Sequence, residues 1–274
     1  MIDKVVFMCG AGHSGSTLLG LVLGSHSQGH YLGEAKKSKY LYDLDKPERK
    51  RYCKVCGPDC KLWKPFHELK NSGLSLYQRF DKIVDSGFLV DSSKGTEWIQ
   101  SHIDLASAEK RIPYLIYLKR DGRAVLNSRI RKYPDIEAKN HIENWLEQIE
   151  KSDELYNNFK GKKQVLLYHE LTADPALEVS KICEFLDIPY EPGMLEFYEY
   201  EHHPLGGNEG TQSLLSSVKA KGELETKLSS SKQSYLEHPQ AIKHDSKWKT
   251  QLSEDAKNLF DKMVGTLNTS FEEP

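Results

Sequence analysis

The feature that most constrains the fold is a glycine-rich segment between a short apolar run and a helical pattern. Residues 5–9 (VVFMC) predict a buried strand, GAGHSGST follows at residues 10–17, and residues 18–23 (LLGLVL) predict a helix. A strand, a glycine loop and a helix in this order direct backbone N–H groups and the positive helix end at a phosphate. The segment therefore predicts an anion site at the start of an α/β domain.

This loop departs from the nucleotide triphosphatase motif G-x4-G-K-[ST] at one position. Gly10 and Gly15 have the motif's spacing, but Ser16 stands where the lysine that reaches the β- and γ-phosphates belongs. A kinase or nucleotide hydrolase is therefore disfavoured. That alternative would require Mg²⁺ to be held by Thr17 and Asp91.

Further along the chain, short apolar runs alternate with helical periodicity. The runs at residues 88–90, 114–118 and 165–168 predict buried strands. Asp174-Pro175 predicts a helix start, because Asp caps free amides and Pro tolerates the first helical position. Strands separated by helices imply crossover connections, and hence an α/β fold with a largely parallel sheet covered on both faces. Apolar helix faces are predicted from Ile142, Trp145, Leu146 and Ile149, and from Leu259, Phe260, Met263, Val264 and Leu267.

A second anion site is predicted after the strand at residues 114–118, where the sequence continues KRDGRAVLNS. The C-terminal edge of a parallel sheet is where α/β folds bind ligands, and Arg120 offers a forked cation to phosphate oxygens. Ser128 lies about two helical turns on and adds a hydroxyl. Two anion sites on one sheet suggest a nucleotide with phosphate at both its 5′ and 3′ ends. The other basic side chains of this helix are expected mostly to be solvated: Arg123, Arg129, Arg131 and Lys132.

Length and charge limit the remaining possibilities. We expect the 274 residues to form a single domain, residues 1–274. The net charge of −2 argues against a global positive field for nucleic acid or an anionic membrane. The apolar stretches are too short for a membrane span, and the opening residues lack a signal-peptide pattern, so we expect a cytoplasmic protein.

Two segments break the alternation of strands and helices. Residues 36–72 are rich in Lys, Arg, Cys, Pro and aromatics, and residues 218–246 are polar. Because long loops in compact domains are usually functional or disordered, both are expected to be loops or lids over a ligand site.

The cysteines are odd in number, at positions 9, 53, 56, 60 and 183. Cys53, Cys56 and Cys60, with His67 beyond them, have thiolates and an imidazole suited to tetrahedral zinc. The usual repeated C-x2-C pair is absent, so we favour free thiols or one disulfide in a surface insertion, and predict no metal.

Taken together, these motifs resemble those of the sulfotransferase superfamily, particularly its bacterial and protein-tyrosine branches. Residues 12–19 (GHSGSTLL) are similar to the family's 5′-phosphosulfate loop, and residues 120–125 (RDGRAV) with Ser128 to its 3′-phosphate motif. Weaker similarities lie at residues 91–94 (DSSK), 168–171 (YHEL), 206–208 (GGN) and 248–253 (WKTQLS).

The resemblance implies a P-loop nucleoside-triphosphate-hydrolase-like three-layer sandwich with a mostly parallel central sheet. It also implies 3′-phosphoadenosine 5′-phosphosulfate (PAPS) as donor, 3′-phosphoadenosine 5′-phosphate (PAP) as product, and no obligatory metal. The implied donor-binding residues are Gly12, His13, Ser14, Gly15, Ser16, Thr17, Arg120, Ser128, Tyr168, Lys247 and Lys249.

Catalysis by such an enzyme needs a base for the acceptor's proton and a cation at the leaving oxygen. The resemblance nominates Glu34 as base and Lys94 as cation. A carboxylate base works near neutral pH if burial raises its pKa, which a covering lid could provide. The family usually has Arg or Lys where this chain has His13, so either His13 is protonated or Lys94 substitutes. His169, His202 and His203 are reserve bases.

The predicted acceptor is a small-molecule or carbohydrate hydroxyl. The alternatives are the P-loop kinase described above and a catalytically inactive module that binds a nucleotide.

Overall fold

The computed structural model describes residues 1–216 and 241–272, and it contains a five-stranded, mostly parallel sheet with helices around it. The strand order is β2-β3-β1-β4-β5, and β1 and β2 both pair in parallel with β3. The predicted α/β fold and four of the five strands are confirmed, although β5 is mostly exposed or partly buried and ends before Tyr168, so the expectation of a buried strand at residues 165–168 is wrong in its burial. Their bounds are β1 Lys4–Cys9, β2 Gly29–Gly33, β3 Phe88–Asp91, β4 Ile112–Lys119 and β5 Lys162–Leu167.

The contacts within the chain divide it into two compact units, with β1 and β4 running through both. Of the described residues, unit 1 comprises 1–7, 17–114, 191–216 and 241, and unit 2 comprises 8–16, 115–190 and 242–272. Among its described residues, unit 1 contains most of α1 Ser16–Gly24, together with η1 Ala35–Tyr40, α2 Glu48–Arg51, α3 Trp63–Glu68, η2 Leu69–Asn71, α4 Leu76–Asp81, α5 Thr96–Ala108, η3 Pro192–Glu199 and α10 Glu209–Gln212.

In unit 1, residues 36–72 are not the open loop that their composition predicts. They contain η1, α2, α3 and η2, and an aromatic cluster buries α3 against α4. The Trp63 ring lies 5.5 Å from Phe80, and Phe66 lies 4.7 Å from Phe80, measured between ring centroids. These aromatic contacts supply the core that an isolated polar insertion would lack.

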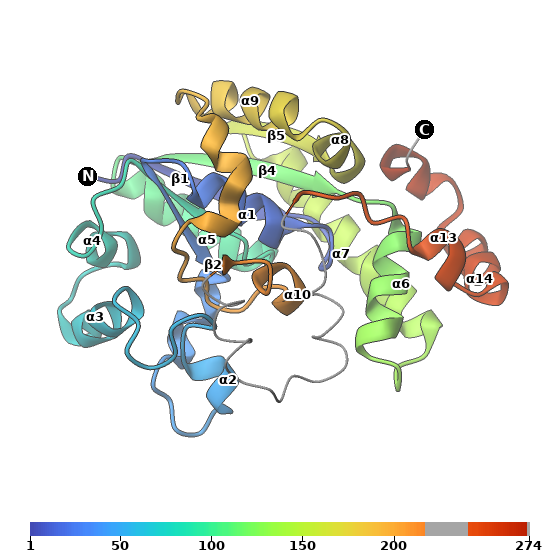
Figure 1. Ribbon diagram of the computed structural model, residues 1–274, viewed down its shortest axis with the longest axis horizontal. Coiled ribbons are helices and arrows are strands. Elements are labelled where there is room, and N and C mark those ends of the chain that lie inside the picture. The colour runs from blue at the N-terminus through green and yellow to red at the C-terminus, as the bar shows by residue number, and fades with distance from the viewer. Residues whose placement is uncertain (217–240, 273–274) are drawn as a thin grey trace. The chain divides into compact units, whose positions relative to one another are not determined.

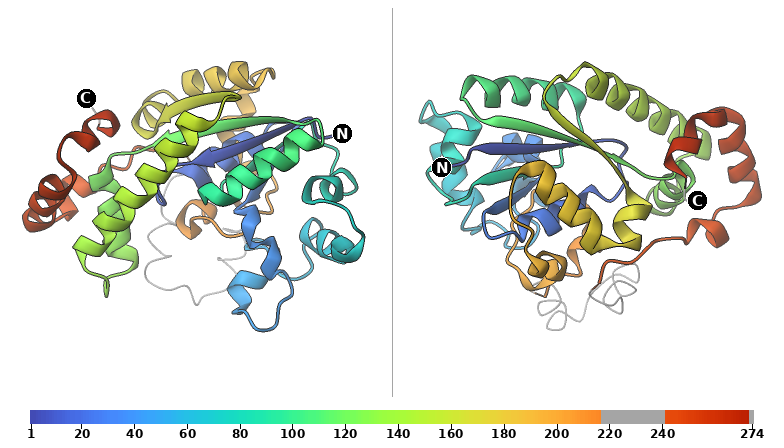
Figure 2. Two further views of the ribbon diagram at one scale, coloured as in Figure 1. Left: turned by 180° about the vertical axis from the view of Figure 1, so that it is seen from behind. Right: turned by 90° about the horizontal axis from the view of Figure 1, so that it is seen from above.

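Unit 2 has its own apolar core. Its helices α6, α13 and α14 lie side by side in Figure 1 and again in Figure 2. Val125 and Leu126 of α6 join Ile142, Trp145 and Ile149 of α7 and Phe260 of α14 in one cluster of buried side chains. The helices of unit 2 are α6 Gly122–Lys132, α7 Ala138–Asn158, α8 Tyr168–Ala173, α9 Pro175–Leu186, α13 Trp248–Gln251, α14 Glu254–Val264 and η4 Gly265–Phe271.

Local sequence signals position several of these helices. The Asp174 carboxylate accepts a hydrogen bond from the Leu177 N–H at 3.0 Å, and Pro175 occupies the first turn of α9, as predicted. Ser253 caps α14 in the same way through the Ala256 N–H. The apolar faces predicted at residues 142–149 and 259–264 are buried or partly buried, whereas Leu267 is exposed in η4.

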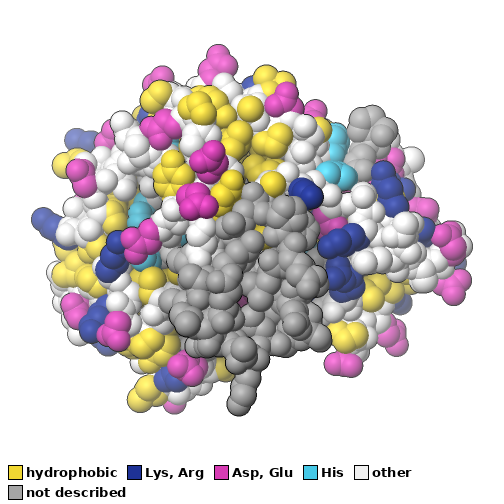
Figure 3. All heavy atoms as spheres, viewed as in Figure 1, with side chains coloured by type: hydrophobic (Ala, Val, Ile, Leu, Met, Phe, Trp, Pro, Cys, Tyr) yellow, Lys and Arg dark blue, Asp and Glu magenta, His cyan; other side chains and the backbone are white. Residues whose placement is uncertain are grey.

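The surface carries both signs of charge. On the face shown in Figure 3, Lys and Arg side chains are interspersed with Asp and Glu side chains among the described residues. Within residues 1–216 and 241–272, no helix is long and apolar enough to cross a membrane. Most of the predicted loop at residues 218–246 lies outside the described residues.

Candidate functional site

The glycine loop between β1 and α1 has the tight backbone that its sequence predicts. Gly15 has φ +97°, and a Cβ there would lie 2.6 Å from a ring carbon of Tyr168, so the position requires glycine. His13 also has positive φ, at 73°. Ser14 and Ser16 of the loop are buried. The loop is therefore closely packed in unit 2 against the start of α8.

A buried arginine, Arg129, is connected to the glycine loop through a shared hydrogen-bond acceptor. The Gly12 N–H donates to Gln148 Oε1 at 2.8 Å, and Arg129 Nη2 donates to the same oxygen at 2.7 Å. Arg129 Nη1 also donates to the His141 carbonyl and to Asn144 Oδ1. The prediction that the basic residues of α6 are mostly solvated is thus wrong for Arg129, whose burial lowers its pKa to about 10.

Arg129→Met is expected to lower the free energy of unfolding by about 2–4 kcal/mol, because it leaves buried acceptors without a donor. Arg131, which is exposed on the same helix, is the matched control, and Arg131→Met should change stability by less than about 0.5 kcal/mol. Urea denaturation monitored by circular dichroism measures both. Equal effects of the two variants would show that the Arg129 hydrogen bonds contribute nothing specific.

The basic motif after β4, at residues 119–128, contacts the glycine loop directly. Arg120 Nη1 donates to the His13 carbonyl at 2.9 Å, and Ser128 Oγ forms a 2.9 Å hydrogen bond with His13 Nδ1. The Arg120 guanidinium also lies 4.3 Å from the centroid of the Tyr168 ring. The structure thus brings together His13, Arg120, Ser128 and Tyr168, all four nominated as donor-binding residues.

An acidic side chain contacts the same arginine. Asp245 Oδ2 lies 3.1 Å from Arg120 Nη2, and the Arg120 side chain is largely buried. Arg120 Nε is also buried and has no hydrogen-bond partner among the described residues. Burial disfavours ionisation of Asp245, but Arg120 more than compensates and lowers the pKa of the carboxyl group. The carboxylate therefore marks a position that an anionic ligand can take.

The segment that carries Asp245 was expected to contribute Lys247 and Lys249. Both lysines are exposed: the Lys247 amide donates to Asp245 Oδ1, and Lys249 Nζ lies 5.9 Å from the Trp248 ring centroid. The segment reaches Arg120 through Asp245. Charge pairing with a distant arginine has no local sequence signal, so Asp245 was missed.

In unit 1, Glu34 follows β2 and lies among lysines. Its carboxylate pairs with Lys37 Nζ at 2.9 Å and accepts the Gly207 N–H at 3.2 Å. Burial alone would raise the pKa of Glu34, but Lys94 and Lys37 outweigh it and hold the pKa below its ordinary value. The net shift in the pKa of Glu34 is therefore downward, opposite to the raised pKa that burial by itself would give. Burial lowers the pKa of Lys94, and Glu34 partly offsets the effect.

Two consecutive backbone amides, those of Gly207 and Asn208, donate hydrogen bonds to Glu34 and to Thr17 respectively. The Gly207 N–H donates to Glu34, and the Asn208 N–H donates to Thr17 Oγ1 at 2.9 Å. Thr17 is the last residue of the loop motif. The segment at residues 206–208, a weak similarity in the sequence, thus places the candidate base beside a candidate donor-binding residue.

Asp91, which the kinase alternative would use as a magnesium ligand, has both carboxylate oxygens hydrogen-bonded within the protein. Its Oδ1 accepts hydrogen bonds from the Ala35 and Ser93 amides, and its Oδ2 accepts one from Trp98 Nε1 at 2.7 Å. Both carboxylate oxygens therefore organise the turn after β3. Thr17 Oγ1 is likewise engaged, by Asn208.

Two of the three reserve bases are occupied elsewhere. His202 Nε2 lies 3.2 Å from Ser25 Oγ and 3.0 Å from the Phe197 carbonyl, and burial lowers its pKa to about 4. His203 Nδ1 contacts the thiols of Cys56 and Cys60. His169 is half-buried.

With this geometry in view, the comparisons with known proteins identify the family. The family model described as sulfotransferase domain matches residues 3–269 of the chain. The chain belongs to the sulfotransferase family. Sulfotransferases of this family generally use PAPS as sulfuryl donor. No protein with a curated description matches this sulfotransferase.

Solved structures agree on the fold of the sulfotransferase. The sulfotransferase domain from the curacin biosynthetic pathway is 19% identical, with a TM-score of 0.57 over 100% of this chain and 99% of that one. The sulfotransferase domain from the Synechococcus PCC 7002 olefin synthase is 18% identical, with a TM-score of 0.53 over 100% and 96% of the two chains. At these identities the likeness shows the P-loop-like α/β fold.

Proposed function

We propose that residues 1–274 act as one sulfotransferase domain that transfers the sulfuryl group of PAPS to a hydroxyl of a small-molecule or carbohydrate acceptor. The observation that carries this proposal is the convergence of Arg120 and Ser128 on His13 of the glycine loop. A nucleotide with phosphate at both ends needs a 5′ cradle and a 3′ cation next to each other. Family membership supplies the reaction class.

The residues of unit 2 fit such a donor. The loop from Gly12 to Ser16 would hold the 5′-phosphosulfate with backbone amides. Arg120 and Ser128 would bind the 3′-phosphate. The buried Arg120 Nε and the Asp245 carboxylate on the same guanidinium support an anion there.

The transfer itself moves one group and one proton. The acceptor oxygen forms a bond to sulfur, the bond between sulfur and the bridging phosphate oxygen breaks, and PAP leaves with the electron pair. Glu34 takes the acceptor's proton, and the positive charge of Lys94 stabilises the oxygen that becomes negative. Because Lys37 and Lys94 keep Glu34 ionised at neutral pH, the carboxylate is ready to accept a proton.

Calorimetric titration of the purified chain tests the donor assignment. We expect PAP to bind tightly without added metal, and ATP with Mg²⁺ to bind at least about 100-fold more weakly. Stronger binding of ATP with Mg²⁺ would favour the kinase alternative. Turnover of PAPS over a panel of hydroxyl acceptors separates an enzyme from an inactive binding module, since the latter binds PAP and transfers nothing.

Asp245→Asn is expected to tighten PAP binding by about 3- to 10-fold, because it removes an anion that competes with the 3′-phosphate for Arg120. Asp135→Asn, an equal charge change at an exposed position, is the control and should leave affinity unchanged. Calorimetry at constant ionic strength measures both. Weaker binding in Asp245→Asn would mean that the carboxylate orients Arg120 for the ligand.

The Glu34 carboxyl is expected to titrate below the ordinary glutamate value of 4.5, so it becomes protonated only at more acidic pH. Lys37→Met removes one of the cations that lower this pKa, so the titration should move to higher pH. Carbon-13 NMR of glutamate-labelled protein measures it, with Glu34→Gln assigning the signal. Lys39→Met, an exposed lysine nearby, should leave the midpoint in place; an equal shift would indicate a general charge effect.

A further inference from the structure

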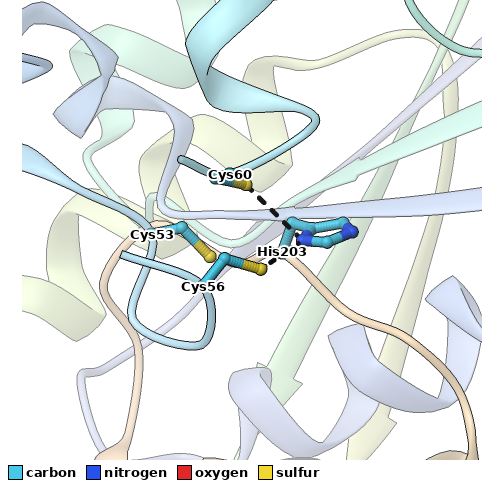
Figure 4. Close-up of side chains that lie close together, drawn as sticks. All are labelled: Cys53, Cys56, Cys60 and His203. Carbon is cyan, nitrogen blue, oxygen red and sulfur yellow. Dashed lines mark hydrogen bonds between the residues drawn. The ribbon is translucent and has the colours of Figure 1, made fainter. Parts of the chain in front are cut away.

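Apart from the nucleotide residues, the chain brings three thiols and an imidazole together in unit 1. The ligand atoms of Cys53, Cys56, Cys60 and His203 all lie within 4.8 Å of one another. Cys53, Cys60 and His203 are buried and Cys56 is partly so. Figure 4 shows the side chains converging from two separate segments. The sulfuryl transfer proposed above uses none of these four side chains.

The local sequence builds the first half of this cluster. The Gly57 N–H donates to the Cys53 carbonyl at 3.0 Å, and Gly57 has φ +79°, so the chain turns immediately after Cys56. The Cys60 carbonyl accepts the Lys64 N–H at the start of α3. A tight turn after a C-x2-C pair and a third thiol at a helix start bring three sulfur atoms to one point.

The fourth group comes from far along the chain. His203, 147 residues after Cys56, places Nδ1 3.0 Å from the Cys56 sulfur and 3.5 Å from the Cys60 sulfur. Trp63 Nε1 donates to the His203 carbonyl at 2.5 Å and fixes the backbone. The sequence had nominated His67, but its ring packs 4.5 Å from Tyr42.

The second ring nitrogen of His203 has a carboxylate partner, as is common for metal-binding histidines. His203 Nε2 lies 3.3 Å from the Glu201 carboxylate. Metal-binding histidines commonly donate their second ring N–H to a carboxylate, which fixes the ring and the tautomer. Nδ1 is then the nitrogen that carries the lone pair towards the sulfurs.

We propose that Cys53, Cys56, Cys60 and His203 bind a structural zinc ion. Ligands about 2.0–2.3 Å from zinc lie about 3.3–3.8 Å apart in a tetrahedron, close to the separations between His203 Nδ1 and the two sulfurs. Three thiolates and an imidazole favour zinc over hard cations. Four protein ligands close the coordination sphere, so the ion is structural.

The ion would join two segments that support the candidate base. Beyond His203, Leu205 exchanges backbone hydrogen bonds with Leu32 and Glu34, and Gly207 then donates to the Glu34 carboxylate. Zinc at His203 would anchor this stretch to the turn at residues 53–60. The zinc site itself does not depend on the proposed sulfuryl transfer.

Metal analysis of the full chain, purified in reductant from zinc-supplemented medium, tests this inference. Inductively coupled plasma mass spectrometry should find about one zinc ion per chain. Cys56→Ser and His203→Ala should reduce it at least about 10-fold, whereas His67→Ala and Cys183→Ala should retain it. Zinc retained in Cys56→Ser and His203→Ala would overturn the ligand assignment.

Cobalt(II) exchange keeps the test independent of variants that fail to fold. The cobalt form of the unaltered chain should show thiolate-to-cobalt charge transfer and the intense visible bands of tetrahedral cobalt. Added zinc should abolish both signals. An unaltered chain that holds no zinc and gives no such spectrum, or that contains a disulfide among these cysteines in reductant, would overturn the proposal.

Discussion

Glu34→Gln is expected to lower turnover with the best acceptor by about 10²- to 10⁴-fold, while PAP affinity stays within about 2-fold. The substitution keeps an oxygen for the Gly207 N–H but removes the carboxylate that would accept the proton. Steady-state sulfation assays at saturating PAPS, with parallel calorimetry, measure the two effects.

Two further observations make this result interpretable. The thermal midpoint of Glu34→Gln should remain close to that of the unaltered chain, which separates lost chemistry from lost structure. A turnover that falls less than about 10-fold, with unchanged stability, would assign the proton to another base, with half-buried His169 the next to test.

Arg120→Ala is expected to weaken PAP binding by roughly 100-fold, because it removes charge-assisted hydrogen bonds to the 3′-phosphate in a buried site. Arg120→Lys keeps the charge but loses the planar fork. Its PAP binding should therefore be about 10-fold weaker than that of the unaltered chain, a smaller loss than in Arg120→Ala. Calorimetry with PAP measures both variants.

Adenosine 5′-phosphate provides the control for this prediction, since it lacks only the 3′-phosphate of PAP. Its affinity should change little in Arg120→Ala, apart from the lost hydrogen bond to the His13 carbonyl. Arg131→Ala, at an exposed position of α6, should bind PAP normally. If both nucleotides weaken equally, Arg120 shapes the loop and does not bind the 3′-phosphate.

Much of the fold could be predicted from local patterns. The glycine loop, its flanking strand and helix, and the basic motif after β4 each occupy a few consecutive residues. Their chemistry depends on backbone conformation and helix ends, which neighbouring residues largely specify. The same holds for the Asp174-Pro175 start of α9.

β2 could not be predicted in this way. Its sequence, GHYLG, has two glycines and a histidine, and it lacks the apolar run of a buried strand. It becomes a strand because β3 offers it a parallel edge, with Tyr31 opposite Val90. Glu34 takes its place only because this edge strand forms.

The burial and pairing of side chains whose partners are distant in sequence could not be predicted either. Arg129 looks like a surface residue until α7 supplies Asn144 and Gln148 as acceptors. Asp245 meets Arg120 across 125 residues. The buried acceptors lie on α7, and no residue next to Arg129 in the sequence indicates them.

The sequence by itself therefore determined the α/β class, the positions of the two motifs predicted to bind anions, and the family that they resemble, because each rests on residues close together in the chain. Only the tertiary structure decided which charges are buried, that lysines lower the pKa of Glu34, and that His203 in place of His67 joins the three thiols. Burial and pairing depend on elements that meet only when the chain folds, and no local pattern encodes them.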